Sequence, residues 1–181
     1  MTNEERIVLL KIARDAIAAR IAGEAPPAIV AGSRHAGAFV SIHRHGELRG
    51  CIGHIEADRP LAEVVAQCAV SAANFDPRFS AVTADELADA EIELSVLGPL
   101  EPIAGPEQIE IGRHGLLVAR DARRGLLLPQ VATEWKWDAV TFLGQTCRKA
   151  GLPITAWKEG AAIWRFEADV FSEAAVRASD R

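Results

Sequence analysis

The chain has 181 residues, a net charge of −5 at pH 7, 49% hydrophobic residues and 25% charged residues. This size allows one sizeable core or two closely packed lobes, and the residue balance is that of an ordinary globular protein. The acidic charge and the lack of a basic block argue against nucleic acid as a partner. No apolar run reaches the roughly 18 residues of a membrane span, so we expect no membrane association.

The cysteines indicate the compartment. Cys51, Cys68 and Cys147 are odd in number, far apart and free of any CxxC pair. This usage predicts a reduced, cytoplasmic protein without a disulfide framework, and it argues against a zinc ribbon or a self-contained iron–sulfur site. The first 14 residues are charged and amphipathic and lack the apolar centre of a signal peptide, which also favours the cytoplasm.

The first half of the chain predicts helices around one hairpin. Thr2-Asn3-Glu4-Glu5 is a capping box that opens a helix, and Gly23 ends it. The segments 36–43 and 48–52 are typical of strands joined by a His45-Gly46 turn. The other elements expected here are a helix over 60–74, a short helix opened by the capping box Thr83-Ala84-Asp85-Glu86, and a strand over 91–97.

The second half begins with a connection rich in proline and glycine, residues 98–106, which is the best place for a boundary between lobes. A hairpin over 116–120 and 125–128 follows, and Pro129-Gln130 ends its second strand. Asp138 is the expected N-cap of the last helix, and 163–171 is typical of a final strand. We therefore predict an α+β fold: a mixed, largely antiparallel sheet flanked by helices, with a larger and a smaller lobe in one compact unit.

The segment with the most chemistry is Leu48-Arg49-Gly50-Cys51-Ile52-Gly53. Glycines inside a strand indicate a bulge or a close approach to the backbone. Alternation along the strand would put Arg49 and Cys51 on one face, where the guanidinium favours the nucleophilic thiolate. The alternative is a buried structural cysteine on a strand kinked by glycine. Cys68 and Cys147 lie on apolar helical stripes and are expected in the core.

Histidines near this hairpin offer a base or a ligand. His43 shares a face with Cys51 if the strands pair, and His54 is close enough in sequence to reach the thiol. A cysteine with a histidine base and an orienting carboxylate, here Glu93 or Asp76, is a pattern for nucleophilic catalysis. A metal held by Cys51 with the two histidines is the alternative, but no spacing is diagnostic of it. We predict no metal site and, without a P-loop or GxGxxG motif, no cofactor.

Two further polar positions stand at the ends of predicted elements. Arg78, in Asp76-Pro77-Arg78-Phe79, binds a carboxylate or phosphate group of a ligand, or it pairs with Asp76. Gln130 follows a proline at a strand end and faces a cleft, or it is an exposed polar residue. The residues alone leave both pairs of alternatives open.

Several separated motifs agree with one family. In chain order they are Phe39-Val40-Ser41-Ile42-His43, Gly46 through Gly53, Asp76-Pro77-Arg78-Phe79, Ile92-Glu93-Leu94-Ser95-Val96-Leu97, Gly115-Leu116-Leu117-Val118, Gly125 through Val131, and Trp137-Asp138 through Phe142-Leu143 with Cys147 and Lys149-Ala150-Gly151-Leu152. In this order the chain resembles the AMMECR family, whose bacterial members are called AmmeMemoRadiSam system protein A. The resemblance covers nearly the whole chain and predicts a single AMMECR-type domain over residues 4–172.

The resemblance implies a compact α+β protein with a cleft near the Arg-Gly-Cys element. It implies two partners, a Memo-like protein and a radical S-adenosylmethionine (radical SAM) protein, but it specifies no reaction. The site residues that it carries over are Arg49, Gly50, Cys51, Gly53, Asp76, Arg78 and Gln130, whereas His54 is not part of the family pattern.

Two functions from different classes follow. In the first, the protein is an enzyme or part of one, with Cys51 as nucleophile or redox thiol, Arg49 assisting the thiolate, and Arg78 and His43 binding the substrate. In the second, it is a non-catalytic adaptor that presents a substrate or metal to the Memo-like and radical SAM proteins. RNA binding is a third reading, which the acidic charge weighs against. The first is preferred, because a thiol beside an arginine has a physical reason to be reactive.

Overall fold

The structure is a computed structural model that describes residues 1–29 and 34–179. The chain forms two compact units. Unit 1 consists of Met1–Leu97 together with Asp169–Arg181, and unit 2 consists of Gly98–Ala168. The chain leaves unit 1 at the start of the proline- and glycine-rich connection, where the sequence indicates a boundary.

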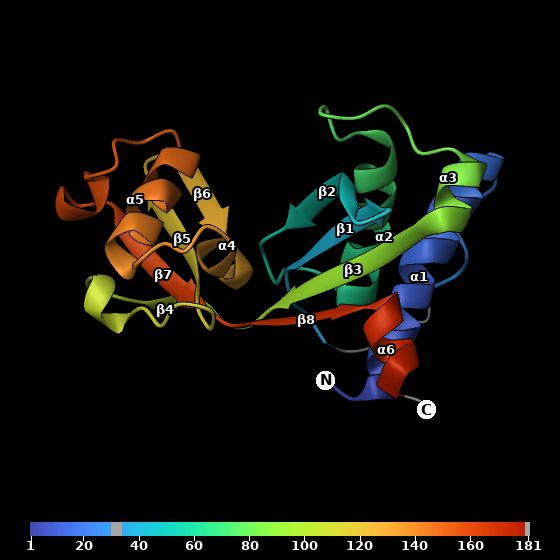
Figure 1. Cartoon of the computed structure of the whole chain (residues 1–181), viewed down its shortest axis with the longest axis horizontal. Helices are drawn as coiled ribbons and strands as arrows, with labels where there is room; N and C mark the ends of the chain where they lie inside the picture. Colours follow the sequence, from blue (N-terminus) through green and yellow to red (C-terminus); the bar gives the residue numbers. More distant parts are fainter. Residues whose placement is uncertain (30–33, 180–181) are drawn as a thin grey trace. The chain divides into compact units, whose positions relative to one another are not determined.

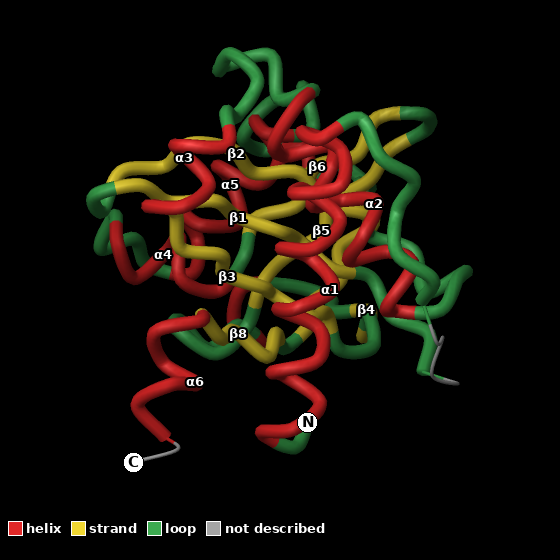
Figure 2. The backbone as a smooth tube through the Cα atoms, turned by 90° about the vertical axis from the view of Figure 1, so that its right-hand side faces the viewer, coloured by secondary structure: helices red, strands yellow, loops and turns green. Residues whose placement is uncertain are grey.

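Unit 1 is a four-stranded sheet with strand order β2-β1-β3-β8, covered by helices. Figure 1 shows α1 and α2 against this sheet, and Figures 1 and 2 both show α6 beside the start of α1. The elements of unit 1 are α1 (Asn3–Ala22), β1 (Ala38–Arg44), β2 (Glu47–His54), α2 (Leu61–Asn74), α3 (Ala84–Asp89), β3 (Ala90–Leu97), β8 (Ala168–Ser172) and α6 (Glu173–Ser179).

Local signals in the sequence account for the first elements. The Thr2 hydroxyl accepts the backbone N–H of Glu5 at 3.2 Å, and the Glu5 carboxylate accepts the backbone N–H of Thr2 at 2.8 Å, which confirms the predicted capping box. Gly23 ends α1 in the left-handed conformation. His45 and Gly46 both have positive φ, at 53° and 83°, as a two-residue turn between β1 and β2 requires.

The two faces of the unit 1 sheet differ in character. One face carries fully buried side chains, including Val40, Ile42 and Leu94, and packs against α1 and α2 in one apolar core. On β1 the alternate residues Phe39, Ser41 and His43 are only partly buried and occupy the opposite face. Each side chain of β2 therefore lies either on the face that packs against the core or on the opposite, partly buried face.

Gly50 sets the distance between β2 and α2. A Cβ at this position would lie 2.3 Å from the backbone oxygen of Ala72, which is closer than any side chain can approach. Gly50 therefore faces the helix, and the lack of a side chain lets the strand approach it. This confirms the expectation of a close approach to the backbone at the Arg-Gly-Cys segment.

Unit 2 has its own sheet, with strand order β4-β7-β5-β6, and its own core. The buried residues Leu116, Val118, Phe142, Leu143 and Ile163 join this sheet to α5. The elements are β4 (Glu101–Pro102), the 3₁₀ turn η1 (Pro106–Gln108), β5 (Gly115–Arg120), β6 (Arg123–Leu127), α4 (Pro129–Glu134), α5 (Ala139–Lys149), the 3₁₀ turn η2 (Ala156–Lys158) and β7 (Ala162–Phe166). Asp138 caps α5 as predicted, because its carboxylate accepts the N–H of Thr141 at 2.7 Å.

The α+β class is confirmed, with two differences in detail. Pro129 does not simply end the preceding strand but occupies the first turn of the short helix α4, where a missing N–H costs nothing. The predicted final strand over 163–171 is two strands, β7 and β8, that belong to different sheets. The strands therefore form two sheets where the sequence predicts one, because the chain returns to unit 1 within that segment.

Across residues 1–29 and 34–179, the structure has no helix with both the length and the apolar character needed to cross a membrane.

Candidate functional site

A β-bulge shapes the Arg-Gly-Cys segment. Ile42 lies opposite Gly50 and His43 lies opposite Leu48, so Arg49 is an extra residue in β2 without a partner in β1. The bulge interrupts the alternation of side chains on which the predicted common face of Arg49 and Cys51 depends. β2 is also the first strand of its sheet, so one side of its backbone has no strand neighbour.

Asp76 and Arg78 occupy that open edge at Cys51. The Cys51 backbone N–H donates to Asp76 Oδ2 at 2.9 Å, and Arg78 Nη2 donates to the Cys51 carbonyl oxygen at 3.4 Å. Both backbone groups of Cys51 that point away from β1 are thus satisfied by one loop. Such contacts fix the position of Cys51 and close the strand edge to pairing with another chain.

The two loop residues are themselves tightly paired. Arg78 donates to Asp76 from its backbone N–H at 3.1 Å, from Nε at 2.9 Å and from Nη2 at 2.7 Å. These bonds hold the pKa of the Asp76 carboxyl far below its usual range, although burial opposes them. Asp76 is only 4% exposed, whereas the Arg78 side chain is 55% exposed. Of the two alternatives predicted for Arg78, pairing with Asp76 is present, and more than half of the Arg78 side chain is still exposed.

A hydroxyl group lies next to the Cys51 thiol. Because the Cys51 N–H bonds to Asp76, Cys51 and the opposite residue Ser41 form a pair without mutual backbone hydrogen bonds, whose side chains come especially close. The Ser41 hydroxyl donates to Cys51 Sγ at 3.3 Å. Glu93 of β3 lies opposite Ser41 in turn, so Cys51, Ser41 and Glu93 form one row across three strands. Cys51 is partly exposed.

Arg49 makes contacts other than those predicted. Its guanidinium bonds to the Glu86 carboxylate through Nε at 2.9 Å and Nη2 at 3.0 Å, and to the Ser80 carbonyl at 2.8 Å. The hydrogen bonds from Arg49 lower the pKa of Glu86 to about 2. The predicted assistance of Arg49 to the thiolate stays a prediction. The arginine whose guanidinium reaches Cys51 through a hydrogen bond is Arg78.

Phe79 connects the two arginines. The Arg78 guanidinium lies 5.3 Å from the centre of the Phe79 ring, and the Arg49 guanidinium lies 5.9 Å from it. Cation–π contacts of this kind restrict both long side chains. Gly53, on the same strand as Cys51, has no side chain, and the Phe39 ring occupies the space where one would be.

The histidines take different positions. His43 lies opposite Leu48 and Glu91, on the sheet face that carries Ser41. His54 Nε2 lies 2.7 Å from Asp58, and this bond lowers the pKa of Asp58. The expected reach of His54 to the thiol is therefore replaced by a contact with a nearby loop. Within the two described ranges, no three His, Cys, Asp or Glu side chains are grouped so that they could hold a metal ion.

Cys68 and Cys147 are core residues, as predicted. Both are buried, Cys68 in unit 1 and Cys147 in unit 2. Burial raises the pKa of the Cys68 thiol to about 11 and also raises that of Cys147. Both thiols are thus held in the protonated, unreactive form at neutral pH.

Gln130 belongs to unit 2, whereas Cys51, Asp76 and Arg78 contact one another within unit 1. It is the second residue of α4, directly after Pro129. Its side-chain oxygen is shielded from solvent and accepts no hydrogen bond from the described residues. The predicted site residues are therefore divided between the two units.

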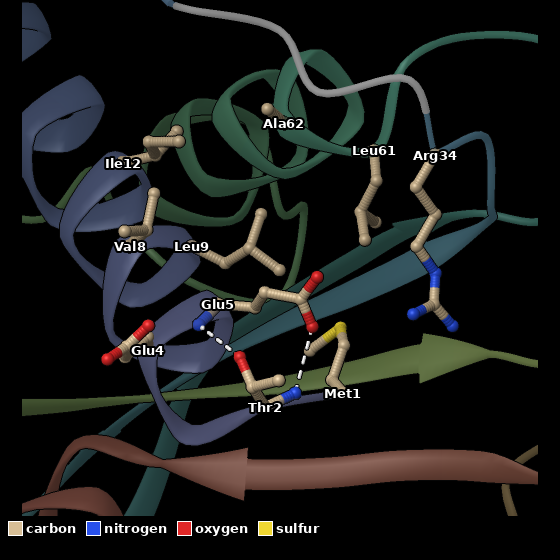
Figure 3. Close-up of a pocket in the computed structure, with 10 residues that line it drawn as sticks. All are labelled: Met1, Thr2, Glu4, Glu5, Val8, Leu9, Ile12, Arg34, Leu61 and Ala62. Carbon is tan, nitrogen blue, oxygen red and sulfur yellow. Dashed lines mark hydrogen bonds between the residues drawn. The ribbon is translucent and has the colours of Figure 1, made fainter.

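Unit 1 also has a cavity of about 330 Å³ away from these residues. It lies between the first turns of α1 and α2, as Figure 3 shows. Its lining is mainly apolar, with Thr2, Glu4, Glu5 and Arg34 as the polar members, and Glu5 is bonded to Thr2 in the capping box. Cys51 does not line it.

Comparisons with known proteins point to one family. The family model described as AMMECR1 matches residues 10–171. A relative from Methanothermobacter thermautotrophicus is 42% identical, with 96% of each chain covered, and Protein MJ0810 from Methanocaldococcus jannaschii is 41% identical, covering 96% of this chain and 92% of its own. The crystal structure of the uncharacterised protein PH0010 from Pyrococcus horikoshii is similar with a TM-score of 0.84 and 37% identity, over 94% of this chain and 92% of that one.

Proposed function

Because this chain belongs to the AMMECR1 family, we propose that it works with a Memo-like protein and a radical SAM protein in a cytoplasmic modification reaction, with Cys51 as the reactive thiol. One observation carries the proposal. Of the three cysteines, Cys51 alone is partly exposed, and its backbone and its sulfur are both held by polar groups from other elements.

Each residue of the site has a role in this proposal. The Cys51 thiolate attacks an electrophilic centre of the substrate, the sulfur–substrate bond forms, and the leaving group departs with its electron pair. The proton of the thiol goes to solvent. Asp76 fixes the backbone of Cys51, and the Arg78 side chain, which is more than half exposed, binds an anionic group of the substrate beside the thiol.

The experiment is a reconstitution of the three proteins with Cys51→Ser and with Cys51→Ala. Both variants are expected to abolish the modification, followed by mass spectrometry of the substrate. Cys68→Ala is the matched control, because it removes a buried thiol from the same unit and leaves Cys51 intact. Undiminished modification by the Cys51 variants would overturn the proposal.

The second candidate is a non-catalytic adaptor. It is favoured by the contacts of the charged side chains around Cys51: Asp76 is paired with Arg78, Arg49 is paired with Glu86, and His54 is bonded to Asp58. Charged side chains that are already bonded to one another are better suited to form a binding surface than to transfer protons. The adaptor reading predicts a stable complex with at least one partner, measurable by sedimentation, and formed equally well by Cys51→Ser. Absence of any complex at high protein concentration would count against it.

A further inference from the structure

Within the described residues, Ser41 is the one side chain found to donate a hydrogen bond to the sulfur of Cys51, at a distance of 3.3 Å. Ser41 is part of the motif Phe39-Val40-Ser41-Ile42-His43, but the site predicted from the sequence does not include it. Its placement follows from the bulge at Arg49, which brings Ser41 opposite Cys51, and from Asp76, which takes the Cys51 N–H away from β1. The closest type of cross-strand pair results.

We infer that Ser41 is a positioning residue for Cys51. Its hydroxyl donates to the sulfur at 3.3 Å and fixes the direction in which the sulfur points. A hydroxyl is suited to this work because it carries one donor that can rotate toward the sulfur without adding charge. The inference rests on the proposed function, since it assigns a role only if Cys51 is the reactive thiol.

The charged and titratable groups around Cys51 come from several elements. They are Asp76 and Arg78 from the loop after α2, Arg49 from the same strand, His43 from β1, Glu93 from β3, and Cys68 from α2. Replacing Ser41 by alanine removes one oxygen atom and leaves all these groups in the chain. A change in the behaviour of the thiol can then be assigned to the lost hydroxyl.

The test is alkylation of the native full-length protein by iodoacetamide across the range from about pH 5 to pH 10, with the modified cysteine identified by mass spectrometry. In the resulting profile of rate against pH for Cys51, Ser41→Ala is expected to lower the rate near neutral pH by about five- to tenfold. Ser41→Thr keeps a hydroxyl on a residue that strands accept, and it should restore the profile. Thermal unfolding of each variant checks that the fold is retained.

The matched control is Ser95→Ala. Ser95 lies opposite Phe39, two residue rows away from the Cys51–Ser41–Glu93 row, so its removal should leave the Cys51 profile unchanged. Superimposable profiles for wild type and Ser41→Ala would overturn the inference, and so would an equal loss of rate in Ser95→Ala. If Cys51 is not alkylated at all in the native wild-type protein, the proposed function fails and this inference fails with it. If Cys51 is alkylated but Ser41→Ala does not change its rate, only this inference is overturned.

Discussion

The carboxylate of Asp76 holds the backbone N–H of Cys51 at 2.9 Å, from a loop 25 residues further along the chain. This contact joins the edge strand β2 to the segment that follows α2. It also explains why the thiol stands close to Ser41, because the N–H of Cys51 is turned away from β1. A side-chain carboxylate here takes the position that a further strand would otherwise occupy.

Replacing this carboxylate is expected to destabilise unit 1. Asp76→Asn removes the charge that pairs with Arg78 and places an amide donor near the Cys51 N–H. We expect a loss of about 2–4 kcal/mol in the free energy of unfolding, measured by urea titration. Asp89→Asn is the control: its carboxylate is mainly exposed and lies 3.4 Å from Arg44, so a loss of at most about 1 kcal/mol is expected. Equal stability of Asp76→Asn and wild type would contradict the assigned role.

The same residue predicts a dependence on acid. The pKa of Asp76 is lower in the folded protein than its unfolded value of about 3.9. Its stabilisation is therefore fully present above about pH 5 and is lost as the pH falls toward the folded-state value. Wild type should lose stability over this acidic range more steeply than Asp76→Asn, as followed by urea titrations at a series of pH values. Parallel curves for the two proteins would show that another group controls the acid response.

Gly50 is expected to tolerate no side chain. In Gly50→Ala the new Cβ would meet the backbone oxygen of Ala72 at 2.3 Å, so β2 or α2 must shift. We expect a loss of about 2–4 kcal/mol by chemical denaturation, together with altered alkylation of the neighbouring Cys51. Gly144→Ala, in helix α5, is the control, because its nearest neighbours would lie at 3.4 Å or more and alanine favours helix. That variant should be at least as stable as wild type.

The buried thiols of Cys68 and Cys147 should not react with alkylating reagents in the folded protein. Because burial raises the pKa of Cys68 to about 11 and also raises that of Cys147, both remain protonated at neutral pH and are shielded from reagents. Mass spectrometry should find them alkylated only after a denaturant is added. Alkylation of Cys68 in native protein at the rate of Cys51 would contradict its placement in the core.

Glu173 is expected to hold the last helix in place. Its carboxylate accepts from Arg14 Nε and Nη2, both at 2.6 Å, and from the backbone N–H of Ile92 at 3.1 Å. Glu173→Gln leaves the partly buried guanidinium of Arg14 without its counter-charge, so we expect a loss of about 2–4 kcal/mol. Glu4→Gln, an exposed change in the first turn of α1, should cost about 0.5 kcal/mol or less. Thermal unfolding of the two variants compares them directly.

Much of the local structure is predictable from the sequence. Capping at Thr2, Thr83 and Asp138 is decided by residues three positions apart, and the His45-Gly46 turn by two adjacent residues, so these signals lie within short segments. The burial of Cys68 and Cys147 follows from helical periodicity in the same way. The pairing of Asp76 with Arg78 is equally local.

The geometry of the site could not be predicted in the same way. A regular hairpin closed by the His45-Gly46 turn would place Ser41 opposite Gly50, and only the bulge at Arg49 moves Ser41 opposite Cys51. The partner of Arg49, Glu86, is 37 residues away, and no periodic pattern connects them. The division of 163–171 between two sheets also depends on distant strands, because a run of apolar residues does not specify its neighbours.

Unit 2 is inserted between two neighbouring strands of unit 1, β3 and β8, and its ends are tied where Gly98 N–H donates to the Glu167 carbonyl at 2.8 Å. A ribosome therefore makes α1 through β3, then all of unit 2, and only then the strand and helix that complete the first sheet. Until β8 is synthesised, the nascent chain keeps one edge of β3 unpaired and Arg14 without Glu173. A chain released early by a premature stop anywhere in unit 2 would expose that edge of β3. Chaperones and proteases would recognise the truncated chain first at this edge.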